Sequence, residues 1–246
     1  MLESVKIEKV LFLDIETVPQ VYKFKDLDEK TADLYQQKTK WLKKEDTTDE
    51  EIYERAGIYA EFGKIVCITC GIVQMHMGKA SVRLKSFADD DEVKLLNNFI
   101  DMCNESFGSG KLMLMCGHNA KEFDFPFIAR RILINGLKLP GPLNIAGKKP
   151  WEIAHLDTME LWKFGDYKHY TSLNLLTHIL GIPSPKQDID GSEVANVYYK
   201  EKDIYRIIRY CENDTIAVAQ LLLRFHNLPI LEEQNILQVN LQLENS

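Results

Sequence analysis

The sequence predicts an α/β fold in which a mixed β-sheet is flanked by helices. Short apolar runs rich in β-branched and aromatic residues, typical of buried strands, lie mostly in the first half of the chain. Longer segments with helical spacing dominate the second half. The chain has 246 residues and shows no internal repeat or low-complexity tract. We therefore expect a single domain that spans residues 1–246.

Each expected strand is a short apolar run bounded by polar or turn-forming residues. The expected strands cover 9–14, 65–73, 80–87, 111–116 and 153–157. The connection between the second and the third is short, which predicts that these two strands pair in antiparallel fashion.

The expected helices have apolar residues at helical spacing. They comprise a pair within 26–55, followed by 92–103, 125–134, 173–180, 191–199 and 203–225. The pair is too short to bury a core of its own, so we interpret residues 22–61 as a helical insertion of surface helices. The last twenty residues are apolar enough to pack, but their pattern assigns them to no element.

Composition narrows the class of protein. The content of 45% hydrophobic and 27% charged residues is that of a globular protein. No apolar run approaches the roughly 18–20 residues that cross a bilayer, and the first ten residues do not resemble a signal peptide. Five cysteines without framework spacing fit a reducing compartment. We therefore expect a cytoplasmic protein that makes no contact with membranes.

The net charge of −7 bears on nucleic-acid binding. Proteins that coat phosphates without sequence preference usually carry a basic surface, which argues against that class here. An enzyme that holds a few nucleotides in a cleft, with its own carboxylates for metal ions, stays open.

Asp14 and Glu16 close the first predicted strand. Residues two apart on a strand point to the same face, roughly 6.5–7 Å apart along the chain. Two such carboxylates repel each other unless a cation or a proton lies between them. The alternative interpretation is a pair of solvated residues at a strand exit.

Tyr210 and Asp214 lie four residues apart in the last predicted helix, so they share one helix face. The apolar residues of this helix indicate burial over much of its circumference, and an unpaired carboxylate beside such a surface is costly. The alternative is that Asp214 is an ordinary surface residue.

Asp124 directly precedes the helix that has Pro126 in its first turn, where a missing N–H costs nothing. As a structural residue it would cap this helix. Three phenylalanines, at 123, 125 and 127, surround it. Exposed aromatic rings beside polar groups can stack on bases, although at least one of the three is expected in the core.

Together these acids form a pattern more specific than any one of them. Asp-x-Glu ends a first strand, Asn-x-x-x-Phe-Asp precedes a helix, and Tyr-x-x-x-Asp lies in a late helix. This order resembles the DEDD superfamily of 3′–5′ exonucleases, in the branch with a tyrosine in the third motif. The sequence is most similar to the proofreading exonuclease domain of family B DNA polymerases, from Val10 to Phe225 and including the Thr171–Gly181 segment.

The resemblance implies a ribonuclease-H-like fold and a 3′–5′ exonuclease that uses two Mg²⁺ or Mn²⁺ ions. Two metals about 3.5–4 Å apart supply an activated water and relieve charge on the leaving oxygen, and hard oxygen ligands select these ions rather than zinc. Asp14 would bridge both metals, and Glu16 and Asp214 would complete the side from which the nucleophilic water attacks. Asp124 would help to hold the second ion through water.

The remaining site residues implied by the resemblance act on water and substrate. Tyr210 would orient the attacking water, because a phenol with a pKa of about 10 is a poor general base. Thr17, Asn119 and Phe125 would bind the substrate.

The expected substrate is the 3′ end of single-stranded DNA. A 3′–5′ exoribonuclease is an alternative, because these acids do not read the 2′-hydroxyl. A nucleic-acid-binding module without turnover is another, and the presence of all four acids and the tyrosine argues against it. The sequence ends at Ser246, so we expect a stand-alone exonuclease rather than part of a polymerase, with any polymerase or repair partner left open.

Other motifs carry weaker signals. Cys67 and Cys70 have the spacing of half a zinc site, but no second half follows and core positions are favoured. Asp157 is expected to cap a helix at Thr158, or else to support the site. Several basic residues can form a rim for phosphates or simply be solvated: Lys121, Arg130, Arg131, Lys163 and Lys168.

Overall fold

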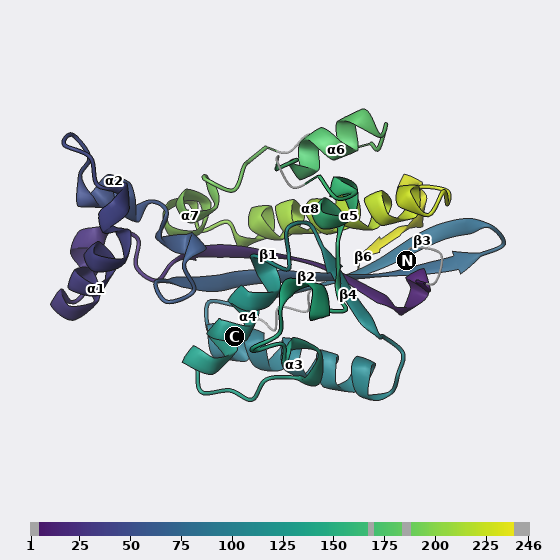
Figure 1. Cartoon of the computed structure of the whole chain (residues 1–246), viewed down its shortest axis with the longest axis horizontal. Coiled ribbons are helices and arrows are strands. Elements are labelled where there is room, and N and C mark those ends of the chain that lie inside the picture. Colours follow the sequence, from purple (N-terminus) through teal and green to yellow (C-terminus); the bar gives the residue numbers. More distant parts are fainter. Residues whose placement is uncertain (1–4, 167–169, 184–187, 239–246) are drawn as a thin grey trace.

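A computed structural model describes residues 5–166, 170–183 and 188–238. Its centre is a six-stranded mixed sheet in the order β5-β4-β1-β2-β3-β6, with helices on both faces (Figure 1). The strands are β1 (Val10–Pro19), β2 (Gly63–His76), β3 (Lys79–Ala88), β4 (Leu114–Gly117), β5 (Leu156–Asp157) and β6 (Ile236–Gln238). The expected α/β class is confirmed.

The three long strands form an antiparallel meander, β1-β2-β3, as the short connection between the second and third strands predicted. Strand β1 is longer than expected and continues past both acids to Pro19. Its pairing with β2 places Asp14 opposite Thr69 and shifts register between Glu16 and Thr17. The prediction that the two acids close the strand was wrong, because the strand continues through the buried Ile15 and Val18.

The outer strands are short and parallel to their neighbours. Strand β4 pairs with β1, β5 with β4, and β6 with β3. Because the β1–β4 pairing ends at Phe12 and Cys116, the β1 residues beyond Leu13 have no strand beside them on that side. Among the described residues, the part of β1 that carries the two acids therefore pairs with β2 alone.

Two helical layers enclose the sheet (Figure 1). One contains α3 (Glu92–Gly108) and α4 (Asp124–Ile134), and the other contains α8 (Ile204–Phe225) with α5 (Thr158–Lys163) and α6 (Leu173–Ile179). Alternate residues of β1 enter the two layers: Leu11 and Leu13 pack in the first, and Val10 and Phe12 in the second. A short helix, α7 (Val194–Asn196), and a π-helical turn (Val197–Glu201) precede α8.

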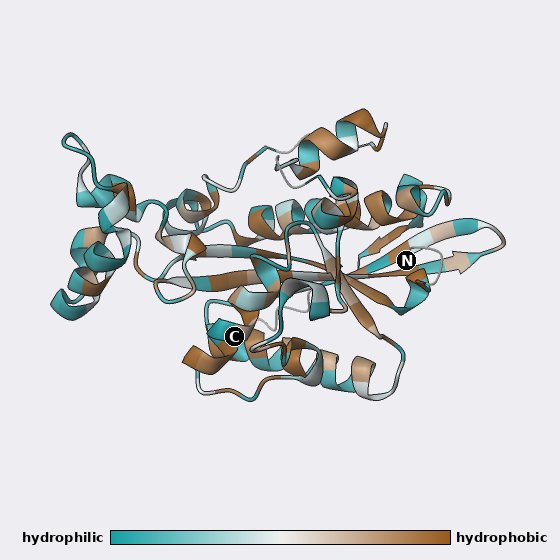
Figure 2. Cartoon of the chain, viewed as in Figure 1, coloured by the Kyte–Doolittle hydropathy of each residue, from teal (hydrophilic) through white to brown (hydrophobic). Residues whose placement is uncertain are grey.

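The insertion contains α1 (Glu29–Thr39) and α2 (Asp49–Tyr53), which project beyond the ends of β1 and β2 (Figure 1). The two helices carry many hydrophilic residues, whereas the core of the sheet is largely hydrophobic (Figure 2). The insertion nevertheless buries a small cluster of its own, in which the rings of Tyr35, Tyr53 and Phe62 pack edge to face. Contrary to expectation, aromatic residues give even this short segment a core.

Among the described helices, none has both the length and the apolar character needed to cross a membrane.

Candidate active site

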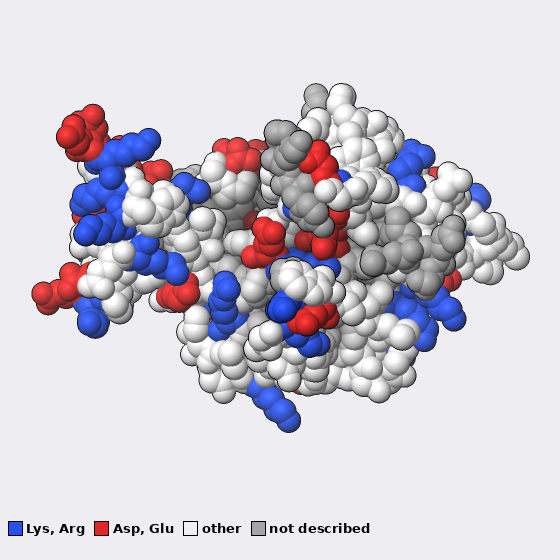
Figure 3. Space-filling view, viewed as in Figure 1, with Lys and Arg blue, Asp and Glu red and all other residues white. Residues whose placement is uncertain are grey.

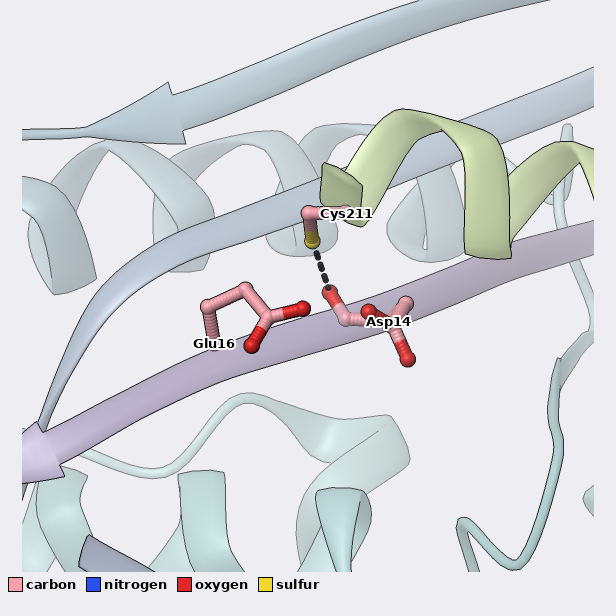
Figure 4. Close-up of side chains that lie close together, drawn as sticks. All are labelled: Asp14, Glu16 and Cys211. Atoms are coloured by element: carbon pink, nitrogen blue, oxygen red, sulfur yellow. Dashed lines mark hydrogen bonds between the residues drawn. The ribbon is translucent and has the colours of Figure 1, made fainter. Parts of the chain in front are cut away.

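Strand β1 presents Asp14 and Glu16 on one side, toward helix α8 (Figure 4). The Glu16 side chain is 7% exposed. One carboxylate oxygen of each residue and the thiol sulfur of Cys211 lie within 4.8 Å of one another. The expectation from strand periodicity, that the two carboxylates are neighbours on one face, agrees with this placement.

Helix α8 brings the third motif to β1. Asp203 caps the helix by accepting a hydrogen bond from the backbone N–H of Arg206, and the helix packs across β1 and β2. Burial and the nearby carboxylates of Asp214, Glu16 and Asp14 raise the pKa of Tyr210 well above its ordinary value. The phenol is therefore neutral near neutral pH and lies among the acids of β1 and α8.

Helix α4 supplies the fourth carboxylate, Asp124, at the sheet edge where β4 has ended. Asp124 is the first residue of the helix, and Phe123 holds the cap position without a side-chain hydrogen bond, so the capping interpretation was wrong. Burial raises the pKa of Asp124 to about 7, although backbone hydrogen bonds from Asp124 and Ile15 oppose this rise. Asp124 is 4% exposed, and its carboxylate accepts the hydrogen bond from Ile15 of β1.

The four acids influence one another's protonation. Burial raises the pKa of Asp14, and the negative charges of Asp124 and Asp214 raise it further. The pKa of Glu16 is raised in the same way, first by burial and then by the charges of Asp14 and Asp214. The structure thus brings together all four carboxylates from three distant segments.

The cluster has the character of a cation site. The Oδ2 atom of Asp14 is buried and has no hydrogen-bond partner among the described residues. Buried like charges of this kind are costly unless protons or a cation compensate them. The carboxylate oxygens are hard ligands of the type that Mg²⁺ and Mn²⁺ prefer. Burial raises the pKa of the Cys211 thiol, which lies beside these oxygens.

The loop after β4 borders the cluster and is held by Asp157. This residue caps α5, as expected, by accepting hydrogen bonds from the N–H groups of Met159 and Glu160. It also accepts hydrogen bonds at 3.0 Å from the N–H groups of Asn119 and Lys121, which tie the loop to β5. The sequence suggested the cap, whereas the loop contacts become visible only in three dimensions.

Gly117 sets how closely this loop approaches the sheet. A Cβ atom at this position would lie 2.4 Å from the Cβ of Ala120 and 3.2 Å from the carbonyl oxygen of Leu13. Only glycine allows β4 to end so close to β1 and lets the loop turn toward the acids.

The three residues expected to bind substrate have different surroundings. Asn119 has a left-handed backbone with φ of 61°, and its buried Oδ1 atom has no partner among the described residues. The Thr17 hydroxyl donates to the carbonyl of Gly57 at 2.8 Å. Phe125 is fully buried, with its ring against His155, so the prediction that it binds substrate was wrong. The alternation of phenylalanines did not reveal which ring faces the core.

The basic residues do not form one rim. Arg131 is buried in an ion pair with Glu92, whereas Lys121 pairs with Glu160 at 2.7 Å nearer the surface. Lys168 lies outside the described residues. Basic and acidic side chains adjoin in the middle of the face shown in Figure 3.

The cysteine pair is part of the core, as expected. Cys67 and Cys70 are buried free thiols that pack in different clusters, because residues three apart on a strand point to opposite faces. Cys67 nevertheless lies near Asp14 and Glu16, and so does Cys211, which sequence reasoning missed. Its position next to Tyr210 in the buried helix was the available signal.

Comparison with known proteins finds a match to the model of one protein family and a similar fold in a solved structure. Residues 58–240 match the model of a family described as a predicted 3′–5′ exonuclease related to the exonuclease domain of PolB. The matched range includes Asp124, Tyr210 and Asp214, but begins after Asp14 and Glu16. No curated protein matches the chain.

The chain is similar in structure to the family B DNA polymerase from the hyperthermophilic archaeon Pyrobaculum calidifontis, with a TM-score of 0.52 and 16% sequence identity. The similarity covers 88% of this chain and 24% of the polymerase chain, so this chain spans about a quarter of that protein's length. A match at this identity shows the fold alone, and it confirms the expected ribonuclease-H-like architecture.

Proposed function

Because the chain belongs to the family of predicted 3′–5′ exonucleases related to the exonuclease domain of PolB, we propose that it removes nucleotides from the 3′ ends of single-stranded DNA with the help of divalent metal ions. One observation carries the proposal most directly. The buried Oδ2 atom of Asp14 has no hydrogen-bond partner among the described residues, and the charges of Glu16, Asp124 and Asp214, from β1, α4 and α8, interact with that of Asp14.

We assign the metal ligands from this cluster. Asp14 would hold both ions, Glu16 and Asp214 would complete the side from which water attacks, and Asp124 would hold the second ion through water. When bound, two divalent ions activate a water and stabilise the charge that develops on the leaving oxygen. The carboxylates, for their part, fix the ligand oxygens on rigid elements before any ion binds.

Tyr210 acts on the water rather than on the metal. Its pKa is raised, so the phenol keeps its proton and serves as a hydrogen-bond donor and acceptor, not as a general base. A positioned group of this kind contributes to the reaction by orienting its partner. Its place on the same helix as Asp214 makes the two groups move together.

Asn119 is suited to contact the terminal nucleotide. Its amide oxygen is buried without a partner among the described residues, and its left-handed backbone is fixed through the N–H hydrogen bond to Asp157. A buried polar atom of this kind favours a ligand that donates a hydrogen bond, such as a sugar hydroxyl or a base N–H. Thr17 keeps its assignment as a substrate contact through its place one residue after Glu16.

The direct test uses single-stranded oligonucleotides of DNA and of RNA, each labelled at the 5′ or the 3′ end. In Mg²⁺ or Mn²⁺ we expect 5′-labelled DNA to shorten stepwise and 3′-labelled DNA to release labelled mononucleotide at once. EDTA or a blocked 3′ end should stop both. Faster cleavage of RNA would make the protein an exoribonuclease, and binding without cleavage would make it a binding module; either result overturns the proposal.

A further inference from the structure

A cavity of about 730 Å³ lies between the exposed side of α4, helix α5 and the loop that precedes β5. We name it the α4–α5 cavity. We propose that it binds the nucleotides on the 5′ side of the scissile bond, with one base stacked on Trp151 and the backbone phosphates near Arg130 and Lys148. This inference rests on the proposed exonuclease function and assigns the path of the strand outside the carboxylate cluster.

The cavity reaches the loop after β4 that borders the carboxylate cluster. Asn119 and Asp157 line it there, and Asp157 is close enough to Asp124 for its charge to raise the pKa of that residue. Asp124 and the cavity-lining Pro126 are both in the first turn of α4, on different sides of the helix. A strand whose 3′ end reached the acids could therefore continue past Asn119 into the cavity without crossing the core.

The walls of the cavity suit nucleobases. Ala129 and Leu133 of α4 and Leu143 and Ile145 of the facing loop line it with apolar surface. Trp151, also in the lining, is 75% exposed, and the ammonium of Lys149 lies 5.2 Å from the centre of its ring. Exposed aromatic rings beside cations are the common means by which proteins hold single strands without reading sequence.

The charges in the lining suit phosphates. Lys121 pairs with Glu160, and Asp157 is engaged by four backbone N–H groups. Among the described residues, Arg130, Lys148 and Glu122 of the lining make no ion pair, so two cations and one carboxylate are available to a ligand. In a chain with a net charge of −7, unpaired cations at an apolar cavity favour an anionic ligand with apolar faces, which describes a nucleic-acid strand.

The test compares one substrate that is long enough to reach the cavity with one that is not. The p-nitrophenyl ester of thymidine 5′-monophosphate occupies only the carboxylate cluster, whereas a single-stranded DNA 12-mer extends beyond it. For Trp151→Ala we expect KM for the 12-mer to rise roughly 5- to 100-fold, the range for loss of one base–aromatic stack, and KM for the ester to stay unchanged. The double variant Arg130→Gln, Lys148→Gln should also raise KM for the 12-mer and reduce its dependence on salt.

Trp41→Ala is the matched control, because Trp41 is 74% exposed but lies in the insertion. It should change neither KM. Equal losses on both substrates with Trp151→Ala would mean that Trp151 only supports the fold, and no change would fit a site for a protein partner; either overturns the inference.

Hydrolysis tests the proposed exonuclease function, and binding of a single strand tests the α4–α5 cavity separately. If the wild-type protein hydrolyses neither substrate, the exonuclease proposal fails by itself. Fluorescence anisotropy of a labelled 12-mer then tests the cavity alone: weaker binding by Trp151→Ala than by Trp41→Ala supports it, and equal binding contradicts it.

Discussion

The thiol of Cys211 donates a hydrogen bond to the backbone carbonyl of Asp14 at 3.3 Å, across 197 positions of sequence (Figure 4). The contact joins the middle of α8 to the middle of β1. Because Tyr210 precedes Cys211 directly, this contact also fixes where its phenol lies relative to the acids of the strand. The site is thus assembled where two rigid elements meet, which keeps its geometry independent of loop motion.

The first prediction concerns this thiol. Burial, Asp124 and Asp214 raise the pKa of the Asp14 carboxyl, and hydrogen bonding by Cys211 opposes this rise. Replacing Cys211 with valine, which is similar in volume but has no donor, should therefore raise that pKa further. We expect the acidic limb of the pH–rate profile in Mg²⁺ to move to higher pH in Cys211→Val. Cys70→Val, a change to a buried thiol on the other face of the sheet, should leave the profile in place. Identical pH–rate profiles for the two variants would show that Cys211 does not influence the protonation of Asp14.

The second prediction concerns stability in EDTA. Asp124 has a pKa of about 7 in the folded protein, against about 3.9 in an unfolded chain. Between these values the folded state holds a proton that the unfolded state has lost, so this group's contribution to the free energy of unfolding is present at low pH and is lost as the pH rises toward 7.

Urea unfolding at pH 5 and pH 8 measures this effect. We expect Asp124→Asn to lose less stability between the two pH values than the wild-type protein, and Mg²⁺ to stabilise the wild type more at pH 8 than at pH 5. If the free energy of unfolding depends on pH equally in the two proteins, the pKa of Asp124 is not raised in the folded state.

The third prediction separates water positioning from metal binding. Tyr210→Phe keeps the ring and removes one hydroxyl. Turnover should fall roughly 10²- to 10⁴-fold, the range for a positioned group that assists proton movement, while Mn²⁺ affinity stays near that of the wild type. The loss of stability should be about 1 kcal/mol.

Single-turnover rates at saturating Mn²⁺ decide the question. Tyr205→Phe is the control, because Tyr205 lies on the same helix with an exposed side chain. An unchanged rate in Tyr210→Phe would reduce the site to its four carboxylates.

The sequence was sufficient for much of the fold because apolar periodicity is local. Helix α8 begins one residue after the predicted start and ends at the predicted Phe225, since its cap and buried face both lie in the same stretch. Strand β6 could not be predicted, because its three residues pair only with β3, and that neighbour is distant in sequence. The length of β1 was underestimated because acidic residues normally end a buried strand, and here Asp14 and Glu16 lie inside one.

The site was predictable in its residue types and not in its surroundings. The order of acids identified Asp14, Asp124 and Asp214 as partners although they lie in separate segments. Which phenylalanine was buried depended on how α4 packs, and the position of Trp151 on a cavity depended on a loop without periodicity. Three-dimensional contacts, rather than sequence signals, determine these features.

Asp14→Ala removes the carboxylate that we assign to both metal ions, so it shows whether these acids hold the catalytic metals. The measurement is the single-turnover rate on 5′-labelled single-stranded DNA in Mn²⁺, with thermal unfolding in EDTA alongside it. We expect hydrolysis to be abolished while Tm in EDTA is unchanged or higher, because a buried like charge has been removed. If turnover stays near normal, Asp14 holds no catalytic metal, and if the variant no longer folds, Asp14 is a structural residue.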